Sequence, residues 1–297
     1  MTKNDTIKKP TKKTKQPDIV VDNTKLKLVL SWDEIKKEYD RVLKNSSKNI
    51  KAQGFRQGKA PLKIAEGKLG KDRLINKVLE VIIPPKYQEL IEKEKKEPLT
   101  QPEVKPIKMD WGKDWELEIH IAEKPILKLD GYKKSTKKGL KAAVKQLKEQ
   151  KNTATKDKTK EVKLHQIFKS LVEDIQPQIP ELLLKDETKR EIQRLAKELE
   201  KIGLSLDDYL ARRKQKFEEM SSQVAAQALG QLQLEFVLRG LEELEEIKVL
   251  EADKKLELDK IKDQKLKQQA QKDPQYSQYL TSQIKRRKLF DQILEIK

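Results

Sequence analysis

The chain has 297 residues and a formal net charge of +18, and charged side chains (39%) outnumber hydrophobic ones (35%). Such a composition does not favour one large globular core and predicts elongated helices with much solvated surface. Cysteine is absent, which excludes disulfides, thiolate chemistry and Cys-ligated metal centres. The two histidines, His120 and His165, have neither metal-ligand spacing nor a nucleophile partner, so we expect no catalytic residue, metal or cofactor.

The excess of basic residues lies in residues 1–163. Residues 133–163 contain 12 Lys or Arg against 3 Asp or Glu, whereas residues 164–297 contain 25 of each kind. We expect the front of the chain to be attracted to a polyanion, and lysine-rich segments that only aid solubility are the alternative. No apolar run is long enough to span a bilayer and the first residues lack a secretory signal, so we expect no membrane contact and a cytoplasmic location.

Residues 1–22 predict a disordered basic tail, because they are rich in Lys, Thr and Pro and lack hydrophobic periodicity. Residues 23–132 predict an α+β domain. Its first strand is indicated by the alternating leucines of Leu26–Leu30. Ser31 is followed three residues later by Glu34, which is the spacing of a capping box at the start of a helix.

Further helical segments are expected in the middle of this domain. Leu62–Ala65 and Leu74–Ile83 predict helix, and the pair Pro84–Pro85 is expected to end it. Tyr87–Glu94 then predicts a new helix.

A β-hairpin is expected to close the α+β domain. Its strands are predicted at Val104–Met109 and Trp115–Ile121, and Gly112 in the turn between them can adopt a positive φ. The second strand alternates apolar and polar residues, which places His120 on the polar face.

Residues 133–163 predict a short helix followed by a flexible linker. The helix is indicated by a weak apolar stripe of Leu140, Val144 and Leu147. Lys145–Lys160 has no apolar periodicity, and we expect it to be the linker.

Residues 164–297 predict helices throughout. Ser205 is expected to cap a very long helical run, because no proline occurs between Glu181 and Asp273. Forty residues of helix make a rod of roughly 60 Å at about 1.5 Å per residue. Such a rod needs neighbouring helices that bury its apolar stripe.

The segment Gly54–Pro61, GFRQGKAP, has the composition of an exposed tip. Its two glycines allow sharp turns, and they bracket an aromatic side chain and a cation. Phe55 predicts an anchor for a partner, while Arg56 and Lys59 predict contacts with phosphates or carboxylates. The alternative is an ordinary turn in which Phe55 packs into the domain.

The pattern GFRxGKxP resembles the ribosome-docking motif of the trigger factor family of bacterial chaperones, and the similarity extends over about residues 23–132. A second resemblance, to the start of the family's C-terminal helical domain, lies at Ile179–Leu184 and Gly203–Leu210. The resemblance implies that the docking loop contacts the large ribosomal subunit, through a tunnel-exit protein and rRNA. The residues matched to that role are Gly54, Phe55, Arg56, Gly58 and Lys59. Gln57 departs from a position that is often basic in the family.

The resemblance also implies a fold and a function. The fold is an α+β N-terminal ribosome-binding domain followed by an elongated all-α C-terminal chaperone domain. The function is that of an ATP-independent chaperone that shields hydrophobic segments of nascent, unfolded polypeptides. Residues 133–163 stand where the family usually carries a prolyl-isomerase domain. They contain no aromatic residue to line a proline pocket, so we expect no enzyme activity. Whether the free protein forms a homodimer, as family members do, stays open.

Client-binding residues are expected on the apolar stripe of the long helical run. The candidates are Leu210, Phe217, Met220, Val224 and Phe236, with Met220 favoured because methionine adapts to varied partners. Internal helix packing is the alternative for each of them. A further alternative for the whole chain is a basic RNA-binding or ribosome-associated architectural protein without chaperone activity, which the charge of residues 1–163 would also suit.

Overall fold

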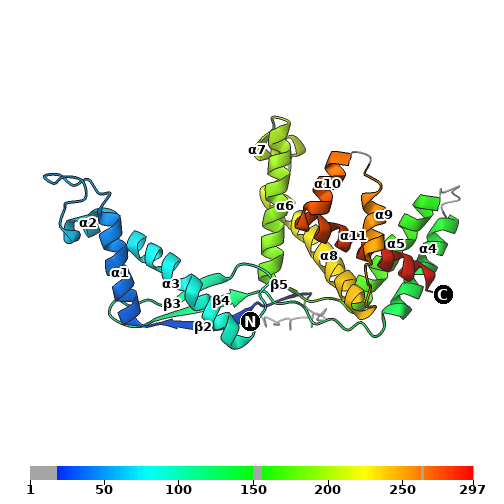
Figure 1. Ribbon diagram of the computed structural model, residues 1–297, viewed down its shortest axis with the longest axis horizontal. Coiled ribbons are helices and arrows are strands. Elements are labelled where there is room, and N and C mark those ends of the chain that lie inside the picture. Colours follow the sequence, from blue (N-terminus) through cyan, green and yellow to red (C-terminus); the bar gives the residue numbers. More distant parts are fainter. Residues whose placement is uncertain (1–18, 150–155, 262–263, 297) are drawn as a thin grey trace, which may run out of the picture. The chain divides into compact units, whose positions relative to one another are not determined.

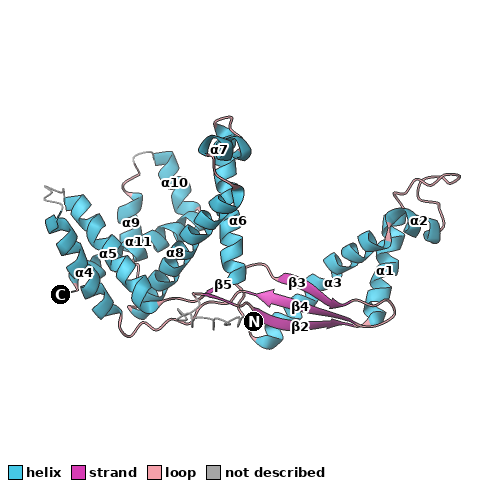
Figure 2. Ribbon diagram, turned by 180° about the vertical axis from the view of Figure 1, so that it is seen from behind, coloured by secondary structure: helices cyan, strands magenta, loops and turns pink. Residues whose placement is uncertain are grey.

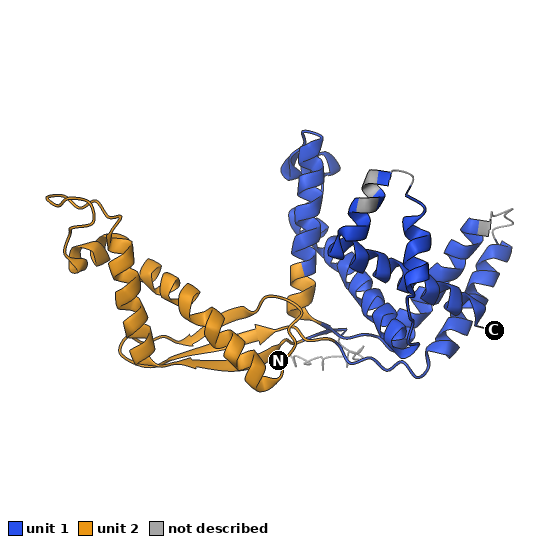
Figure 3. Ribbon diagram, in the orientation of Figure 1, with its two compact units in different colours: residues 1–21, 125–179, 187–297 blue, residues 22–124, 180–186 orange. Residues whose placement is uncertain are grey.

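The computed structural model of the chain describes residues 19–149, 156–261 and 264–296 (Figure 1). Helices make up most of these residues, together with two small sheets (Figure 2). The chain divides into two compact units (Figure 3). The sheet unit consists of residues 22–124 with 180–186, and the helical unit consists of the described parts of residues 1–21, 125–179 and 187–297.

The sheet unit contains a three-stranded antiparallel sheet with the strand order β2-β4-β3. Strand β2 is Thr24–Leu30, β4 is Trp115–Ile121 and β3 is Glu103–Lys108. In the register of β2 with β4, Leu28 lies opposite Leu117, and both side chains are buried. The alternation that predicted β2 and β4 is therefore confirmed at these positions.

Helices α1 (Trp32–Ser47), α2 (Leu62–Leu69) and α3 (Lys71–Glu94) complete the sheet unit. The side chain of Ser31 accepts a hydrogen bond from the backbone N–H of Glu34 at 3.4 Å, which confirms the predicted start of α1. The core joins inward residues of β2 and β4 to one face of α1 and α3. Its buried members are Leu28, Leu30, Ile35, Tyr39, Val42, Leu43, Leu74, Val78, Ile91, Trp115, Leu117, Ile119 and Ile121.

Helix α3 runs through Pro84 and Pro85, so the prediction that the helix ends there is wrong. Proline removes a backbone donor and destabilises a helix interior by about 3 kcal/mol. The helix continues because both of its halves pack on the same core: Leu74 and Val78 are buried before the prolines, and Ile91 is buried after them. Tertiary burial here outweighs the local preference.

The helical unit begins with two antiparallel helices, α4 (Tyr132–Glu149) and α5 (Lys156–Ile175), which lie side by side in Figures 1 and 2. The prediction of a flexible linker at Lys145–Lys160 is wrong for its described residues, 145–149 and 156–160, because these are helical. The predicted stripe of α4 is not its buried face either, since Val144 is exposed. The buried residues are small or polar except for one tyrosine: Tyr132, Ser135, Thr136, Gly139 and Ala143.

The rest of the helical unit is a set of helices around a second core. A two-stranded sheet pairs β1 (Val20–Val21) with β5 (Ile179–Pro180). The helices that follow are α6 (Glu181–Lys201), α7 (Leu206–Arg213), α8 (Phe217–Leu244), α9 (Glu251–Leu258), α10 (Gln264–Lys272) and α11 (Pro274–Glu295). The second core consists of Tyr132, Ile167, Leu171, Val237, Leu238, Leu241, Ile247, Leu289 and Ile293.

The predicted long helical run is two helices, and this prediction is corrected accordingly. Ser205 caps α7 as expected, accepting a hydrogen bond from the backbone N–H of Asp208 at 3.1 Å. The helix then ends at Lys214, which adopts a left-handed conformation with φ of 52°. Lys216 starts α8, where its backbone N–H donates to the carboxylate of Glu219 at 3.4 Å. The 28 residues of α8 make a rod of about 42 Å.

Candidate functional site

The segment between α1 and α2 forms a loop whose shape depends on its two glycines. Gly54 and Gly58 adopt φ values of 80° and 74°, which confirms that both positions need glycine-like freedom. The backbone N–H of Gly58 donates to the carbonyl of Ile50 at 3.1 Å and closes the loop at its base. A Cβ at Gly58 would lie 2.6 Å from the carbonyl oxygen of Lys48, so the end of α1 leaves no room for a side chain there.

The loop presents its aromatic and basic side chains to solvent. Phe55 is 42% exposed, and Arg56 and Lys59 are both exposed. Neither cation has an ion-pair partner among the residues that the structure describes. The tip therefore combines an accessible ring with two positive charges that are available to a partner.

Basic residues surround this tip in the sequence, and one of them ties α2 to the loop. Ten Lys or Arg and two acidic residues lie between Lys44 and Lys77. The ammonium of Lys68, in the last turn of α2, donates to the backbone carbonyl of Lys51 at 2.8 Å and ties the helix to the loop. The loop thus sits in a strongly positive segment that favours an anionic partner.

An aromatic cluster fixes α2 and the hairpin against α1. The Trp111 ring makes edge contacts with Trp32 and Tyr39, at centroid distances of 4.8 and 4.9 Å. The Tyr39 hydroxyl donates to the carboxylate of Glu66 on α2 at 2.7 Å. Burial, and then this bond, raise the pKa of Tyr39 well above its ordinary value. These contacts hold the helices at both ends of the loop, so the tip projects from a fixed base.

The five client-binding candidates are not equally accessible. Leu210, Met220 and Phe236 are buried, so the alternative interpretation of internal helix packing applies to these three. The preference for Met220 as a client contact is therefore not supported. Phe217, at the first position of α8, is 48% exposed. Val224 lines a cavity of about 190 Å³ between α6 and α8 together with Leu195, Ala228 and polar side chains.

Other apolar side chains of the helical unit are more exposed, and none of them was among the five candidates. They lie at helix ends, on exposed helix faces or, for Ile126, in the segment without secondary structure between β4 and α4. They are Ile126 (95% exposed), Ile202 (74%), Leu244 (51%), Leu250 (63%), Leu256 (64%) and Tyr279 (57%).

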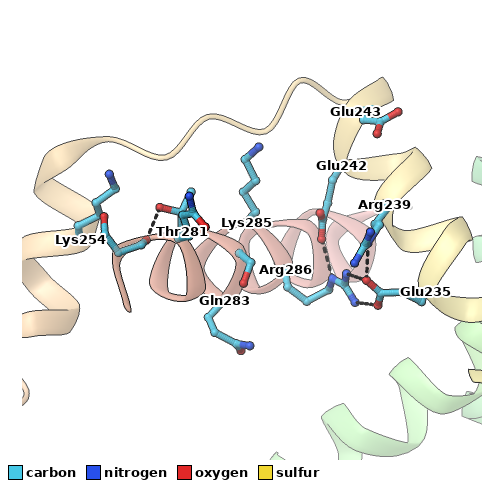
Figure 4. Close-up of a pocket in the computed structure, with 12 residues that line it drawn as sticks. Glu235, Arg239, Glu242, Glu243, Lys254, Thr281, Gln283, Lys285 and Arg286 are labelled. Carbon is cyan, nitrogen blue, oxygen red and sulfur yellow. Dashed lines mark hydrogen bonds and ion pairs between the residues drawn. The ribbon is translucent and has the colours of Figure 1, made fainter. Parts of the chain in front are cut away.

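A polar cavity of about 700 Å³ lies between α8, α9 and α11 (Figure 4). Arg286 of α11 reaches across to α8, donating to Glu242 at 2.6 Å and to both carboxylate oxygens of Glu235 at 3.0 and 3.2 Å. Burial raises the pKa of Glu235, but hydrogen bonds from Arg286 and Arg239 outweigh it and the net pKa is lowered. In this network two arginines, Arg239 and Arg286, balance two glutamates, Glu235 and Glu242. The network therefore connects α11 to α8, as a structural contact does.

The structure corrects the predicted placement of His120. His120 was expected on a polar face, but it is buried, and its Nε2 lies 2.5 Å from the carboxylate of Glu118. The described residues contain no group of three or more side chains suited to bind a metal ion. Over the same residues, no helix combines the length and apolar character needed to cross a bilayer.

Two family models match the chain. The model described as "Bacterial trigger factor protein (TF)" matches residues 12–156, and the model described as "Bacterial trigger factor protein (TF) C-terminus" matches residues 137–295. The second match covers more than half of the chain. The two matches overlap at α4, so no residues between them are left for an intervening domain.

Curated relatives match about a third of the chain. The trigger factors of Streptococcus pneumoniae strains Hungary19A-6 and CGSP14 are each 33% identical to it over 108 residues, and that of strain D39 is 32% identical. The alignments cover 36% of this chain and 25% of each relative, so the chain matches only a quarter of the length of these proteins.

A solved structure resembles nearly the whole chain. It is described as "Promiscuous Substrate Recognition in Folding and Assembly Activities of the Trigger Factor Chaperone", and the TM-score is 0.57 over 96% of this chain and 99% of the other. The sequence identity is 12%, so this likeness concerns the fold. It agrees with an α+β N-terminal part followed by a helical C-terminal part.

Proposed function

The chain belongs to the bacterial trigger factor family, and from this premise we propose that it docks on the large ribosomal subunit and shields hydrophobic segments of nascent polypeptides without using ATP. The observation that carries the proposal is the exposed loop in the family-matched front of the chain. Phe55 is accessible there beside Arg56 and Lys59, two cations without described ion-pair partners. An accessible ring flanked by cations is suited to a protein surface next to rRNA.

The docking half of the proposal is tested by co-sedimentation with intact ribosomes. The double variant Phe55→Ala with Arg56→Ala removes the ring and one charge from the tip, and we expect it to abolish co-sedimentation. The matched control is Leu62→Ala, since Leu62 is an exposed apolar residue (47%) at the start of α2. Undiminished ribosome binding by the double variant would refute the docking role of the loop.

The helical unit is proposed to hold clients through its exposed apolar side chains. Burial of such surface contributes about 25 cal/mol per Å², and weak contacts spread over several helices release a client without nucleotide. Of the five candidates, Phe217 and Val224 remain accessible and stay in this role, joined by Ile202 and Leu250. The resembling solved structure concerns promiscuous substrate recognition, and scattered apolar contacts are suited to varied clients.

The client half of the proposal is tested by aggregation of an unfolded protein. We expect the chain to suppress aggregation, and we expect Ile202→Ser with Phe217→Ser to suppress it less. The control is Ile107→Ser, because the exposure of Ile107 (57%) lies between those of Phe217 and Ile202 but the residue is on β3 of the sheet unit. An RNA-binding or architectural protein without chaperone activity would suppress nothing, so this assay separates the two functions.

The remaining parts of the proposal follow from the family. We propose that the chain is not an enzyme, because its two family matches leave no residues for an isomerase domain. We also propose that it works in the cytoplasm, where its ribosomal partner is found.

A further inference from the structure

Helix α4 carries a face made almost entirely of lysine. At 3.6 residues per turn, six lysines of α4 fall within an arc of about 100°. Every one of these side chains is exposed, and the row extends over about 21 Å at 1.5 Å per residue. The lysine face consists of Lys134, Lys137, Lys138, Lys141, Lys145 and Lys148.

The lysine face points away from the protein because the opposite side of α4 is fixed. The buried residues of the helix, among them Thr136, Gly139 and Ala143, lie on the far side of the helical wheel and face α5. Lys138 is further tied to Asp174 of α5 by an ion pair of 2.7 Å. The face is therefore a row of charges on a packed helix, and it does not depend on a flexible tail.

Acidic neighbours compensate only part of this row. Glu149 is the only acidic residue of α4, and it lies 3.9 Å from Lys145. Lys137, Lys141 and Lys148 have no ion-pair partner among the described residues. Like charges three or four positions apart repel one another and destabilise an isolated helix. An external polyanion would relieve this repulsion on binding.

We propose that the lysine face of α4 binds the phosphodiester backbone of RNA. A row of ammonium groups, of which Lys137, Lys141 and Lys148 have no described ion-pair partner, matches a line of phosphates, and binding releases the counterions that surround the nucleic acid. The face offers no aromatic ring that could stack on a base, and its point charges suit phosphates, so we expect recognition that is independent of sequence. This site goes beyond the proposed function, since it neither includes the docking loop nor requires it.

The composition of α4 favours RNA over the other common polyanion, an acidic membrane. A helix that lies on a bilayer inserts a broad apolar face opposite its basic one. Apart from Tyr132, the side chains of α4 opposite the lysines are small or polar, and this face is packed against α5. Val144 is the only large apolar side chain of α4 that is exposed, at 44%. The helix therefore has charge for a phosphate surface but lacks the apolar area for insertion.

The test compares two triple variants of the full chain. Lys137→Gln, Lys141→Gln and Lys148→Gln remove the three unpaired charges while keeping a good helix former. The control is Lys189→Gln, Lys197→Gln and Lys201→Gln, which removes as many exposed lysines from α6, a helix with six basic and six acidic residues. Binding of a labelled RNA duplex is measured by fluorescence anisotropy across a salt series.

We expect the α4 variant to bind the duplex at least about tenfold more weakly and to reduce the slope of log K against log salt by roughly 2–3. The control variant should bind as the unmodified chain does. The α4 variant should also melt at the same or a higher temperature, because repulsion has been removed, so weaker binding cannot be attributed to unfolding. Equal binding by both triple variants would overturn the proposal.

Two further arms complete the test. Vesicles rich in phosphatidylglycerol are titrated with the unmodified chain, and binding to vesicles without binding to RNA would overturn the assignment in favour of a membrane. Phe55→Ala with Arg56→Ala should keep most of the affinity for the RNA duplex. Failure of ribosome docking and failure of this RNA site therefore give different results, since the first leaves duplex binding intact.

Discussion

Gly139 of α4 faces Ile167 of α5 so closely that a Cβ added to the glycine would lie 2.5 Å from the Cα of Ile167. The two helices are therefore joined backbone against backbone at this point. The contact explains why a lysine-rich segment without a clear apolar stripe is helical, since small residues let α4 approach α5 and bury its backbone.

This contact makes a prediction about stability. Gly139→Ala is expected to destabilise the chain by about 1–3 kcal/mol, because overpacking forces the two helices apart. Gly230→Ala is the matched control: Gly230 is also inside a helix, but nothing lies within 4 Å of its added Cβ. That variant should be as stable as the parent or up to about 1 kcal/mol more stable. Urea denaturation of both variants checks the pair, and a harmless Gly139→Ala would contradict the close packing.

The docking loop gives a second prediction. Gly58→Ala should distort the loop more than Gly54→Ala. Both positions have a positive φ, which disfavours alanine by about 1–2 kcal/mol. Only at Gly58 would the added Cβ also lie 2.6 Å from the carbonyl oxygen of Lys48. We expect Gly58→Ala to weaken ribosome binding more than Gly54→Ala. Equal effects in co-sedimentation would show that the base of the loop does not control its tip.

The Arg286 network gives a prediction about stability and pH. Arg286→Gln leaves Glu235 and Glu242 without their shared partner, and we expect a loss of about 1–3 kcal/mol. The control is Arg287→Gln, since Arg287 is half exposed and its ion pair with Glu257 lies at the surface. That change should alter stability by only about 0.2–1 kcal/mol.

The pH dependence of the Arg286 effect follows from the lowered pKa of Glu235. A carboxyl whose folded pKa is lowered contributes stability above its unfolded pKa of about 4.3 and loses it as the pH falls through the folded value. The difference in stability between the parent and Arg286→Gln should therefore shrink below about pH 4. Thermal melts at several pH values measure it, and a difference that grows on acidification would contradict the network.

The proposed absence of an isomerase domain gives a fourth prediction. Residues 133–149 and 156–175 are two packed helices and belong to the two family matches. We expect the chain to leave the proline-limited refolding of a test protein unchanged, with a phase of tens to hundreds of seconds as in its absence. A known prolyl isomerase in the same assay is the positive control. Acceleration by this chain would show that another part of it has acquired the activity.

Local patterns in the sequence predicted the elements that depend on local chemistry. The strand Trp115–Ile121, the caps Ser31 and Ser205, and the positive φ of Gly112 were all predicted correctly, because alternation, capping and glycine conformation act over a few residues.

Predictions that depended on tertiary packing failed. Helix α3 continues through Pro84–Pro85 because both halves share one core, and Lys145–Lys160 is helical where described because α4 packs on α5. The candidate client-binding residues likewise depended on tertiary packing, which leaves some of them buried and others exposed. Met220 and Phe217 both recur at helical spacing, but only the structure shows that the first is buried and the second exposed. Periodicity identifies an apolar residue without saying what covers it.

The most direct test of the central claim is a contact measurement from the tip of the loop. A photoreactive phenylalanine analogue is placed at Phe55, and in a second sample at Leu99, which is as exposed (41%) and belongs to the same unit. After irradiation with intact ribosomes, docking predicts crosslinks from position 55 to a protein of the large subunit and none from position 99. No ribosomal crosslink from position 55, or the same products from both positions, would contradict docking through this loop.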